Sequence, residues 1–171
     1  CVEETGLWRP WRIKYIQDIE SIRDEGCIFC TKPDSGDDRQ SLILYRGERA
    51  YIMMNLFPYN TGHIMVSPYR HLGEFEDLSA EEMAELMDLT SLAIKTIKRA
   101  MEPQAFNLGM NLGKVAGAGF HEHLHMHVVP RWLGDTNFMP VVAKAKVLPE
   151  SIEENYDRLL SSLVEILSEG D

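Results

Sequence analysis

Residues 121–129 read His121-Glu122-His123-Leu124-His125-Met126-His127-Val128-Val129, so four of the chain's six histidines recur at every second position. Successive side chains of an extended strand point to opposite faces. A strand from Phe120 to Val128 would therefore carry all four imidazoles on one face. The other face would present an apolar set to the core, namely Phe120, Leu124, Met126 and Val128. The alternation predicts a half-buried strand with a row of histidines along it.

A row of histidines on one face of a strand can serve catalysis, and three other interpretations compete with that one. A purely structural role is disfavoured, because four imidazoles in file would be costly to bury unpaired. The segment His121-Glu122-x-x-His125 also matches the zinc-protease pattern HExxH, but that pattern needs a helix, and the flanking glycines and Pro130 argue against one. A single catalytic metal ion on the whole row is disfavoured because alternate strand residues lie roughly 6.5–7 Å apart, so four cannot all reach it.

The remaining elements follow from periodicity and turn residues. Ser79 opens a capping box before a helical apolar pattern that ends ahead of Pro103, which predicts one long helix. A last helix is expected from near Pro149 to about Leu167, and the turn-rich residues 31–40 are expected to form a loop. Further strands are predicted over residues 41–45, 50–55, 63–66 and 106–111. Strands clustered around one long helix indicate an α+β fold with a largely antiparallel sheet.

Composition bounds the class of protein. The 171 residues carry 27 acidic and 17 basic side chains, a formal net charge of −10. This balance disfavours binding to nucleic acid, whose non-specific affinity comes from neutralised phosphates, but it leaves small phosphorylated ligands open. No apolar run approaches the ~20 residues of a membrane helix, so no membrane partner is expected. The first twenty residues lack the apolar core of a secretory signal, so we expect a cytoplasmic protein.

Cys27 and Cys30 form a Cys-x-x-Cys pair, which is the spacing of half a zinc site. The chain's three cysteines do not make a disulfide framework. A thioredoxin-like redox motif is disfavoured, because a polar loop and not a helix is expected after the pair. The residues themselves leave two alternatives open, a zinc half-site or two reduced thiols.

Residues 123–129 fit the histidine triad (HIT) motif, His-φ-His-φ-His-φ-φ, where φ is apolar. The chain resembles the branch of that family near the fragile-histidine-triad hydrolases and the diadenosine tetraphosphate phosphorylases. The similarity extends over the opening Trp8 to Arg12, Cys27-Ile28-Phe29-Cys30, Asn55, Gly62-His63, Pro130-Arg131 and residues 132–139. The resemblance implies a HIT-like fold, with an antiparallel sheet of about five strands, one long helix and a C-terminal helix. It also implies one domain over residues 1–171, with an N-terminal anchor segment at 1–26 and a C-terminal helical extension at 145–171.

The resemblance further implies roles for particular residues. His125 would attack the α-phosphate of a nucleotide and form a nucleotidyl-histidine, which water or phosphate then resolves. His127 would hydrogen-bond phosphate oxygens, and His63 would support the nucleophile, although by its position His63 could equally cap local backbone. The nucleotide would also be bound by Asn55, Asn111, Gly117 and Gly119. A structural Zn²⁺ would be held by Cys27, Cys30, His71 and His123, and the protein would be a homodimer.

The function that these expectations favour is cleavage of a dinucleoside polyphosphate, such as diadenosine tetraphosphate, by hydrolysis or phosphorolysis. One alternative is an enzyme that hydrolyses nucleoside phosphoramidates or adenylated small molecules through the same intermediate. Another is a nucleotide-binding regulator with little turnover. The chain also departs from its relatives, many of which carry Gly-Gln-Ser or Gly-Gln-Thr before the triad. Here Gly117-Ala118-Gly119-Phe120 stands in that place, so a side-chain contact to phosphate is missing or replaced.

Overall fold

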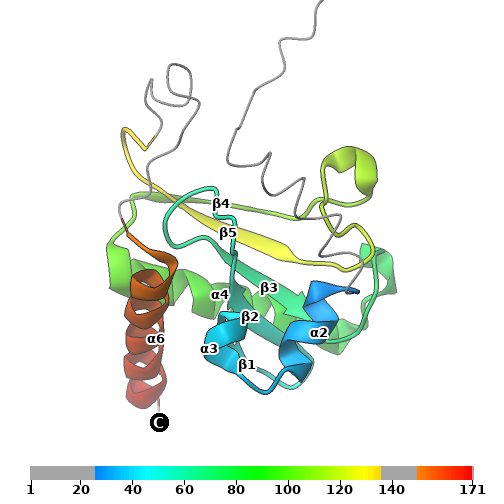
Figure 1. Ribbon diagram of the computed structural model, residues 1–171, viewed down its shortest axis with the longest axis horizontal. Coiled ribbons are helices and arrows are strands. Elements are labelled where there is room, and N and C mark those ends of the chain that lie inside the picture. Colours follow the sequence, from blue (N-terminus) through cyan, green and yellow to red (C-terminus); the bar gives the residue numbers. More distant parts are fainter. Residues whose placement is uncertain (1–25, 136–149, 171) are drawn as a thin grey trace, which may run out of the picture.

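The computed structural model of the protein describes residues 26–135 and 150–170 (Figure 1). The anchor segment predicted at 1–26 lies outside the described residues except for Gly26. The same is true of Pro149 and of the first part of the predicted C-terminal extension. Within the described residues, no helix is both long enough and apolar enough to cross a membrane.

Five strands form one antiparallel sheet in the order β1-β2-β3-β5-β4. The strands are β1 (Ile43–Arg46), β2 (Ala50–Met54), β3 (Ile64–Pro68), β4 (Ala105–Gly109) and β5 (Met126–Arg131). The predicted α+β fold with an antiparallel sheet of about five strands is confirmed. The late strand β5 lies between β3 and β4, so the histidine motif enters the sheet next to the hairpin of β2 and β3.

Four α-helices and two short 3-10 turns complete the described chain. The α-helices are α2 (Ile28–Asp34), α3 (Asp38–Ser41), α4 (Ala80–Met101) and α6 (Ile152–Glu169). The 3-10 turns are η1 (Phe75–Asp77) and η2 (Lys114–Ala116). Helix α4 begins at the predicted capping box of Ser79 and Glu82 and ends two residues before Pro103. Helix α6 begins at a second capping box, formed by Ser151 and Glu154.

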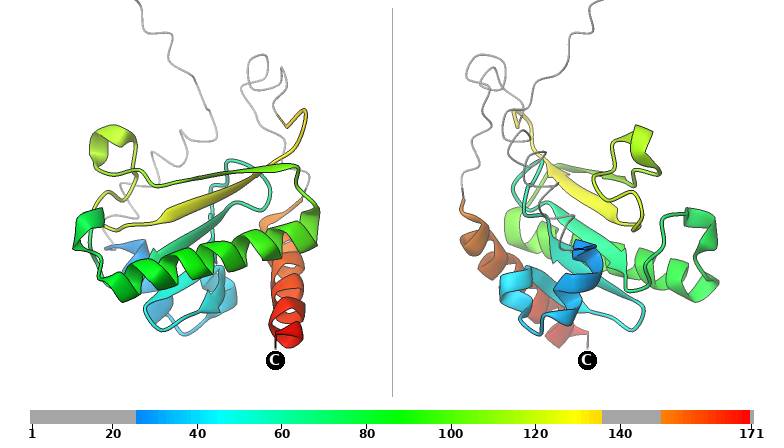
Figure 2. Two further views of the ribbon diagram at one scale, coloured as in Figure 1. Left: turned by 180° about the vertical axis from the view of Figure 1, so that it is seen from behind. Right: turned by 45° about the vertical axis from the view of Figure 1, so that its right-hand side comes forward.

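The two faces of the sheet carry separate hydrophobic clusters. The larger cluster joins the sheet to α4 and α6 and includes Leu86, Ile97 and Leu159, each at most 1% exposed. Figure 2 shows α4 running across this face of the sheet, with α6 beside one end of it. The smaller cluster lies on the opposite face and contains Phe29, Ile43, Tyr51, Met53, Met65 and Phe120. The candidate site residues described below gather on this second face.

The loop predicted over residues 31–40 is wrong, because α2 and α3 occupy most of it. Pro33 lies inside α2, although it has no N–H to donate to the carbonyl of Phe29 one turn earlier. In the structure the hydroxyl of Tyr51 donates to that Phe29 carbonyl at 2.8 Å. A side chain from a distant strand therefore replaces the hydrogen bond that the proline removes.

The strand predicted from Phe120 to Val128 is also wrong in its first half. Residues 119–123 form a turn and a bend, and β5 begins only at Met126. The backbone N–H of Leu124 donates to Leu72 O at 2.8 Å, outside the ladder of the sheet. The four histidines consequently do not form one straight row, and Phe120 packs with the smaller cluster and not with Leu124. Since residues 121–125 are not helical either, the zinc-protease interpretation is excluded.

Candidate functional site

His125 stands immediately before β5 and is 7% exposed. Its Nδ1 lies 2.8 Å from the carbonyl oxygen of His123, an acceptor, so Nδ1 carries the proton and Nε2 keeps its lone pair. The ring stacks on Phe29 with 4.6 Å between centroids. Burial lowers the pKa of His125, which favours the neutral imidazole. The ring therefore has the tautomer and charge that a nucleophile requires.

His63 is fully buried, and it orients His127 through a directed pair of hydrogen bonds. The backbone N–H of Tyr59 donates to Nδ1 of His63 at 3.0 Å, so the proton of His63 lies on Nε2. That Nε2 lies 3.0 Å from Nδ1 of His127, which must then act as acceptor. The network assigns the proton of His127 to its own Nε2. His127 is thus set as a hydrogen-bond donor beside His125, at 4.9 Å between the two ring centroids.

A cavity of about 300 Å³ opens in front of these rings. It brings together every residue that was predicted to bind nucleotide: Asn55, Asn111, Gly117, Gly119, His125 and His127. His63 supports His127 from behind and is not among the lining residues. The backbone N–H of Gly117 already donates to Lys114 O, so this predicted phosphate donor is engaged within its own turn.

The rest of the cavity wall was not predicted from the sequence. It consists of Ile28, Phe29, Thr31, Lys32, Met53, Leu56, Phe57, Tyr59, Met65 and Phe120. Residues 28 and 32 are one helical turn apart, which would have placed them on one face had α2 been recognised. Met53 and Met65 face each other across β2 and β3 on the face opposite α4. Both strands are buried throughout, so their sequences contain no apolar–polar alternation that would assign these side chains to a face.

A second cluster lies beside the cavity and unites Cys27, Cys30, His71 and His123. Nδ1 of His123 lies 3.3 Å from Sγ of Cys27, 3.5 Å from Sγ of Cys30 and 3.3 Å from Nδ1 of His71. Metal–ligand bonds of ~2.0–2.3 Å in a tetrahedron put the ligand atoms about 3.3–3.8 Å apart, so these four groups fit a zinc ion. Nε2 of His123 lies 2.9 Å from the Pro68 carbonyl, which directs the Nδ1 lone pair into the cluster.

The cluster and the cavity share one segment of backbone. The side chain of His123 faces the cysteines, while its carbonyl accepts the Nδ1–H of His125. His121 belongs to neither set and borders a separate hollow of about 340 Å³ next to the cluster. The prediction of a polar loop after the cysteine pair was wrong, because helix α2 begins directly after Cys27. Two histidines and two cysteines converge nonetheless, an arrangement suited to a metal ion and not to a thioredoxin-like motif.

Comparison with known proteins assigns the architecture. The model of the HIT domain matches residues 37–132. The chain belongs to the HIT domain family. AP-4-A phosphorylase of Mycobacterium tuberculosis is 43% identical over 162 residues, which cover 91% of this chain and 82% of that protein. The asymmetrical bis(5'-nucleosyl)-tetraphosphatase of Schizosaccharomyces pombe is 30% identical over 95 residues, 56% of this chain and 52% of that enzyme.

The fold agrees with this assignment. A Zn-bound histidine triad family protein from Mycobacterium smegmatis superposes with a TM-score of 0.68 at 22% identity, covering 85% of this chain and 98% of that one. A uridylyltransferase superposes with a TM-score of 0.67 at 16% identity, covering 92% of this chain and 52% of that one. At these identities the likeness concerns the fold alone.

Proposed function

We propose that this protein cleaves dinucleoside polyphosphates, with diadenosine tetraphosphate as the model substrate, through a nucleotidyl intermediate on His125. The observation that carries the proposal is the lone pair of Nε2, which the Nδ1 hydrogen bond leaves available at the wall of a 300 Å³ cavity. The 43% identity to AP-4-A phosphorylase over most of both chains supports the substrate class.

The proposed reaction has two displacements at one phosphorus. Nε2 of His125 attacks the α-phosphorus, and the bond from that phosphorus to the bridging oxygen breaks with its electrons leaving on the departing polyphosphate. The Nε2–H of His127 donates to a phosphate oxygen as negative charge shifts there. In the second step water or inorganic phosphate attacks the same phosphorus and expels His125. The similarity to a protein named AP-4-A phosphorylase supports inorganic phosphate as the group that accepts the nucleotidyl moiety in this second step.

Product analysis with diadenosine tetraphosphate tests this proposal. Without inorganic phosphate, hydrolysis gives ATP and AMP; with phosphate, phosphorolysis gives ATP and ADP. We expect ADP to appear when phosphate is added. Formation of neither pair of products would refute the assignment, and binding of nucleotide without turnover would favour a regulator.

His125→Asn is the matched variant for the nucleophile. Asparagine can still donate to the His123 carbonyl, but it has no ring nitrogen with which to attack phosphorus. We expect turnover to fall by at least about 10³-fold, a loss in the range seen when a nucleophile is removed, while AMP still binds. Turnover close to that of the parent would exclude His125 as the attacking group.

We also propose that Cys27, Cys30, His71 and His123 hold a structural zinc ion. Four protein ligands leave no open position, so the ion would supply stability and would fix the backbone that holds His125. A reducing compartment such as the cytoplasm would keep both cysteines as thiols able to bind it. Metal analysis of purified protein should give about one zinc per chain, and Cys30→Ser should lose it. Zinc far below one equivalent in protein never exposed to chelator would contradict the site.

The proposed homodimer is supported by strand β4. This strand ends the sheet order, and four of its five residues are exposed. An exposed edge strand offers unpaired backbone groups to a second chain. Light scattering should give the mass of two chains, and a single-chain mass at micromolar concentration would overturn this part of the proposal.

A further inference from the structure

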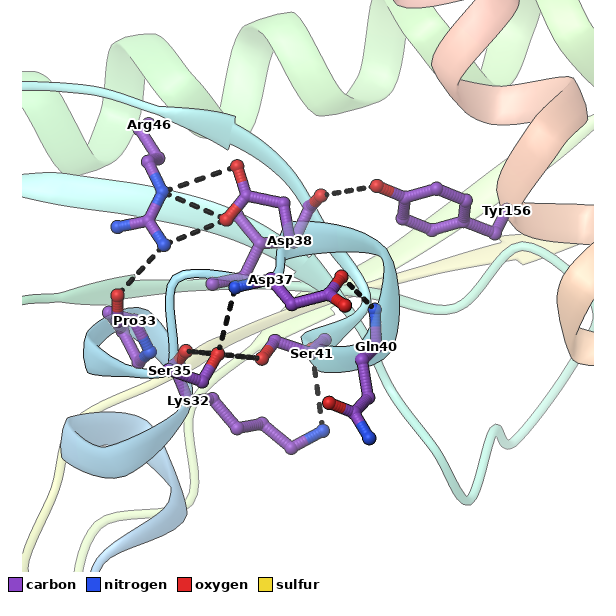
Figure 3. A network of polar contacts seen from close by, with 10 residues as sticks. Lys32, Pro33, Ser35, Asp37, Asp38, Gln40, Ser41, Arg46 and Tyr156 are labelled. Carbon is purple, nitrogen blue, oxygen red and sulfur yellow. Dashed lines mark hydrogen bonds and ion pairs between the residues drawn. The ribbon is translucent and has the colours of Figure 1, made fainter.

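Lys32 introduces a positive charge into a largely apolar part of the cavity wall. It projects from α2 one turn after Ile28, and both side chains line the cavity. Its Nζ donates to the Ser41 carbonyl at 3.3 Å, as Figure 3 shows. Within residues 26–135 and 150–170 it forms no ion pair with a carboxylate. An ammonium has three N–H donors, so two remain beyond the one that Ser41 accepts.

The Ser41 carbonyl is held in a fixed position. The Ser41 hydroxyl lies 2.7 Å from the Ser35 hydroxyl, and the backbone N–H of Ser41 donates to Asp37 O. The guanidinium of Arg46 ties Asp38 to the Pro33 carbonyl and so joins α3 to the end of α2 (Figure 3). The ammonium is therefore anchored at a defined point, although burial lowers the pKa of Lys32.

The sheet register gives the direction from Lys32 to the reacting histidines. Ile43, Met53, Met65 and His127 are successive cross-strand partners over β1, β2, β3 and β5. Neighbouring strands lie ~4.8 Å apart, so this row spans about 14 Å. Ser41 precedes Ile43 by two residues, which puts the ammonium near the β1 end of the row. His127 and His125 occupy the other end.

The space between the two ends suits a nucleoside. Met53 and Met65 form an apolar floor, and Ile28 and Phe57 add apolar walls, which is a surface that an aromatic base can cover. If the α-phosphate lies at His125, as the proposed function requires, the base points across β3 and β2 toward β1. Its far edge then meets Lys32.

We infer that Lys32 donates a hydrogen bond to a ring nitrogen at the edge of the substrate's purine base and so selects the base. This inference rests on the proposed function. An ammonium can only donate hydrogen bonds. It therefore favours a base whose edge presents a hydrogen-bond acceptor at that point, and it disfavours a base that presents an amino or C–H group there. A site built for such a hydrogen bond discriminates strongly, because the analogue leaves a buried donor unpaired.

Binding of AMP and of its 1-deaza, 3-deaza and 7-deaza analogues tests the inference, since each analogue replaces one ring nitrogen by C–H. We expect one analogue to bind the parent protein about tenfold more weakly than AMP, the loss typical of a hydrogen bond to a charged group. In Lys32→Met that difference should disappear. In Lys32→Arg, which keeps a cationic donor, it should persist in part. Lys95→Met on α4, an exposed lysine on the opposite face of the sheet, should behave as the parent.

The outcomes separate this inference from the function on which it rests. If diadenosine tetraphosphate is cleaved but Lys32→Met weakens AMP and all analogues equally, Lys32 does not read the base. The same conclusion follows if Lys32→Met alters only the dependence on polyphosphate length, which would make it a phosphate contact. If Lys32→Met changes the stability of the protein but not the relative affinities of AMP and its deaza analogues, the role of Lys32 is only to connect α2 to α3. If the parent protein neither binds nucleotide nor cleaves the substrate, the proposed function and this inference fall together.

Discussion

His63 shows how a residue that does not line the cavity controls one that does. It accepts from the Tyr59 backbone at Nδ1 and faces His127 with Nε2, so one backbone N–H sets the tautomer of two rings in series. The sequence alone could not assign this role, because a histidine at the start of a strand is equally suited to capping backbone. In the structure His63 does both, because its Nδ1 accepts from local backbone while its Nε2 reaches His127, and that second contact is a property of the fold.

At this scale we predict that His63→Phe lowers kcat by about 10- to 100-fold, the range for removing an outer hydrogen-bond partner that orients a functional side chain, with a smaller effect on KM. Phenylalanine keeps an aromatic ring in a site that is fully buried but cannot hydrogen-bond His127. The ¹⁵N shifts of the His127 ring should report the change of tautomer. Unchanged shifts together with an unchanged kcat would assign His63 a packing role only.

Helices and strands that are defined by contacts between residues close in the sequence could be predicted, whereas those that depend on contacts with distant residues could not. The signals of α4 are local: the Ser79 cap, its reciprocal partner Glu82 and the stop before Pro103. Helix α2 could not be predicted, because Tyr51 from β2 satisfies the carbonyl that Pro33 leaves without a donor. The late start of β5 likewise depends on contacts with the segment around Leu72. The structure brings His125 and His127 of the predicted motif to one cavity, but the wall supplied by α2 was missed with the helix itself.

The start of α4 gives a prediction for pH. The guanidinium of Arg70 donates to both oxygens of Glu82 at 2.8 and 2.6 Å, and the Ser79 N–H donates as well. These bonds lower the pKa of Glu82 from 4.5 to about 2. A depressed pKa in the folded state adds stability above the unfolded pKa, and that stability is lost as the pH falls from about 4.5 toward 2.

We therefore expect Glu82→Gln to be less stable than the parent at pH 7, with the difference shrinking across that acid range. Urea denaturation at a series of pH values measures it. Asp88→Asn is the matched control, because Asp88 is an exposed carboxylate of the same helix without an ion pair in the described residues. A gap between Glu82→Gln and parent that stays constant from pH 7 to pH 2 would contradict the assigned cause.

On the scale of the whole molecule, the sheet separates two hydrophobic clusters. Helix α6 belongs to the larger one: the Tyr156 hydroxyl donates to Ile43 O at 2.8 Å, and Leu159 is 0% exposed. The guanidinium of Arg39 is paired with Asp157 and lies 5.5 Å from the centroid of the Tyr156 ring. These contacts attach α6 to α3 and to the first strand of the sheet, and the helix packs on the face opposite the cluster that lines the cavity.

Leu159→Ala should reduce the free energy of unfolding by about 2–5 kcal/mol, the cost of a cavity in a closed core. The affinity for AMP should stay within about twofold, since sites without shared partners contribute independently. Leu167→Ala, at a position that is 40% exposed on the same helix, should cost less than about 1 kcal/mol. A large loss of AMP affinity in Leu159→Ala at a temperature where it remains folded would show that the two clusters are coupled.

The separation of the clusters has a consequence for how sequences of this kind can change. Substitutions beneath the long helix alter thermal tolerance and leave the pocket wall unchanged, whereas those at Phe29, Met53 and Met65 alter what the pocket accepts and, since these side chains are at most 5% exposed, stability as well. A lineage can therefore adjust to a hotter or colder habitat on one side of the sheet and to a new nucleotide on the other. A protein engineer can therefore raise durability on the α4 side without changing selectivity, but a library that changes selectivity must be screened for durability too.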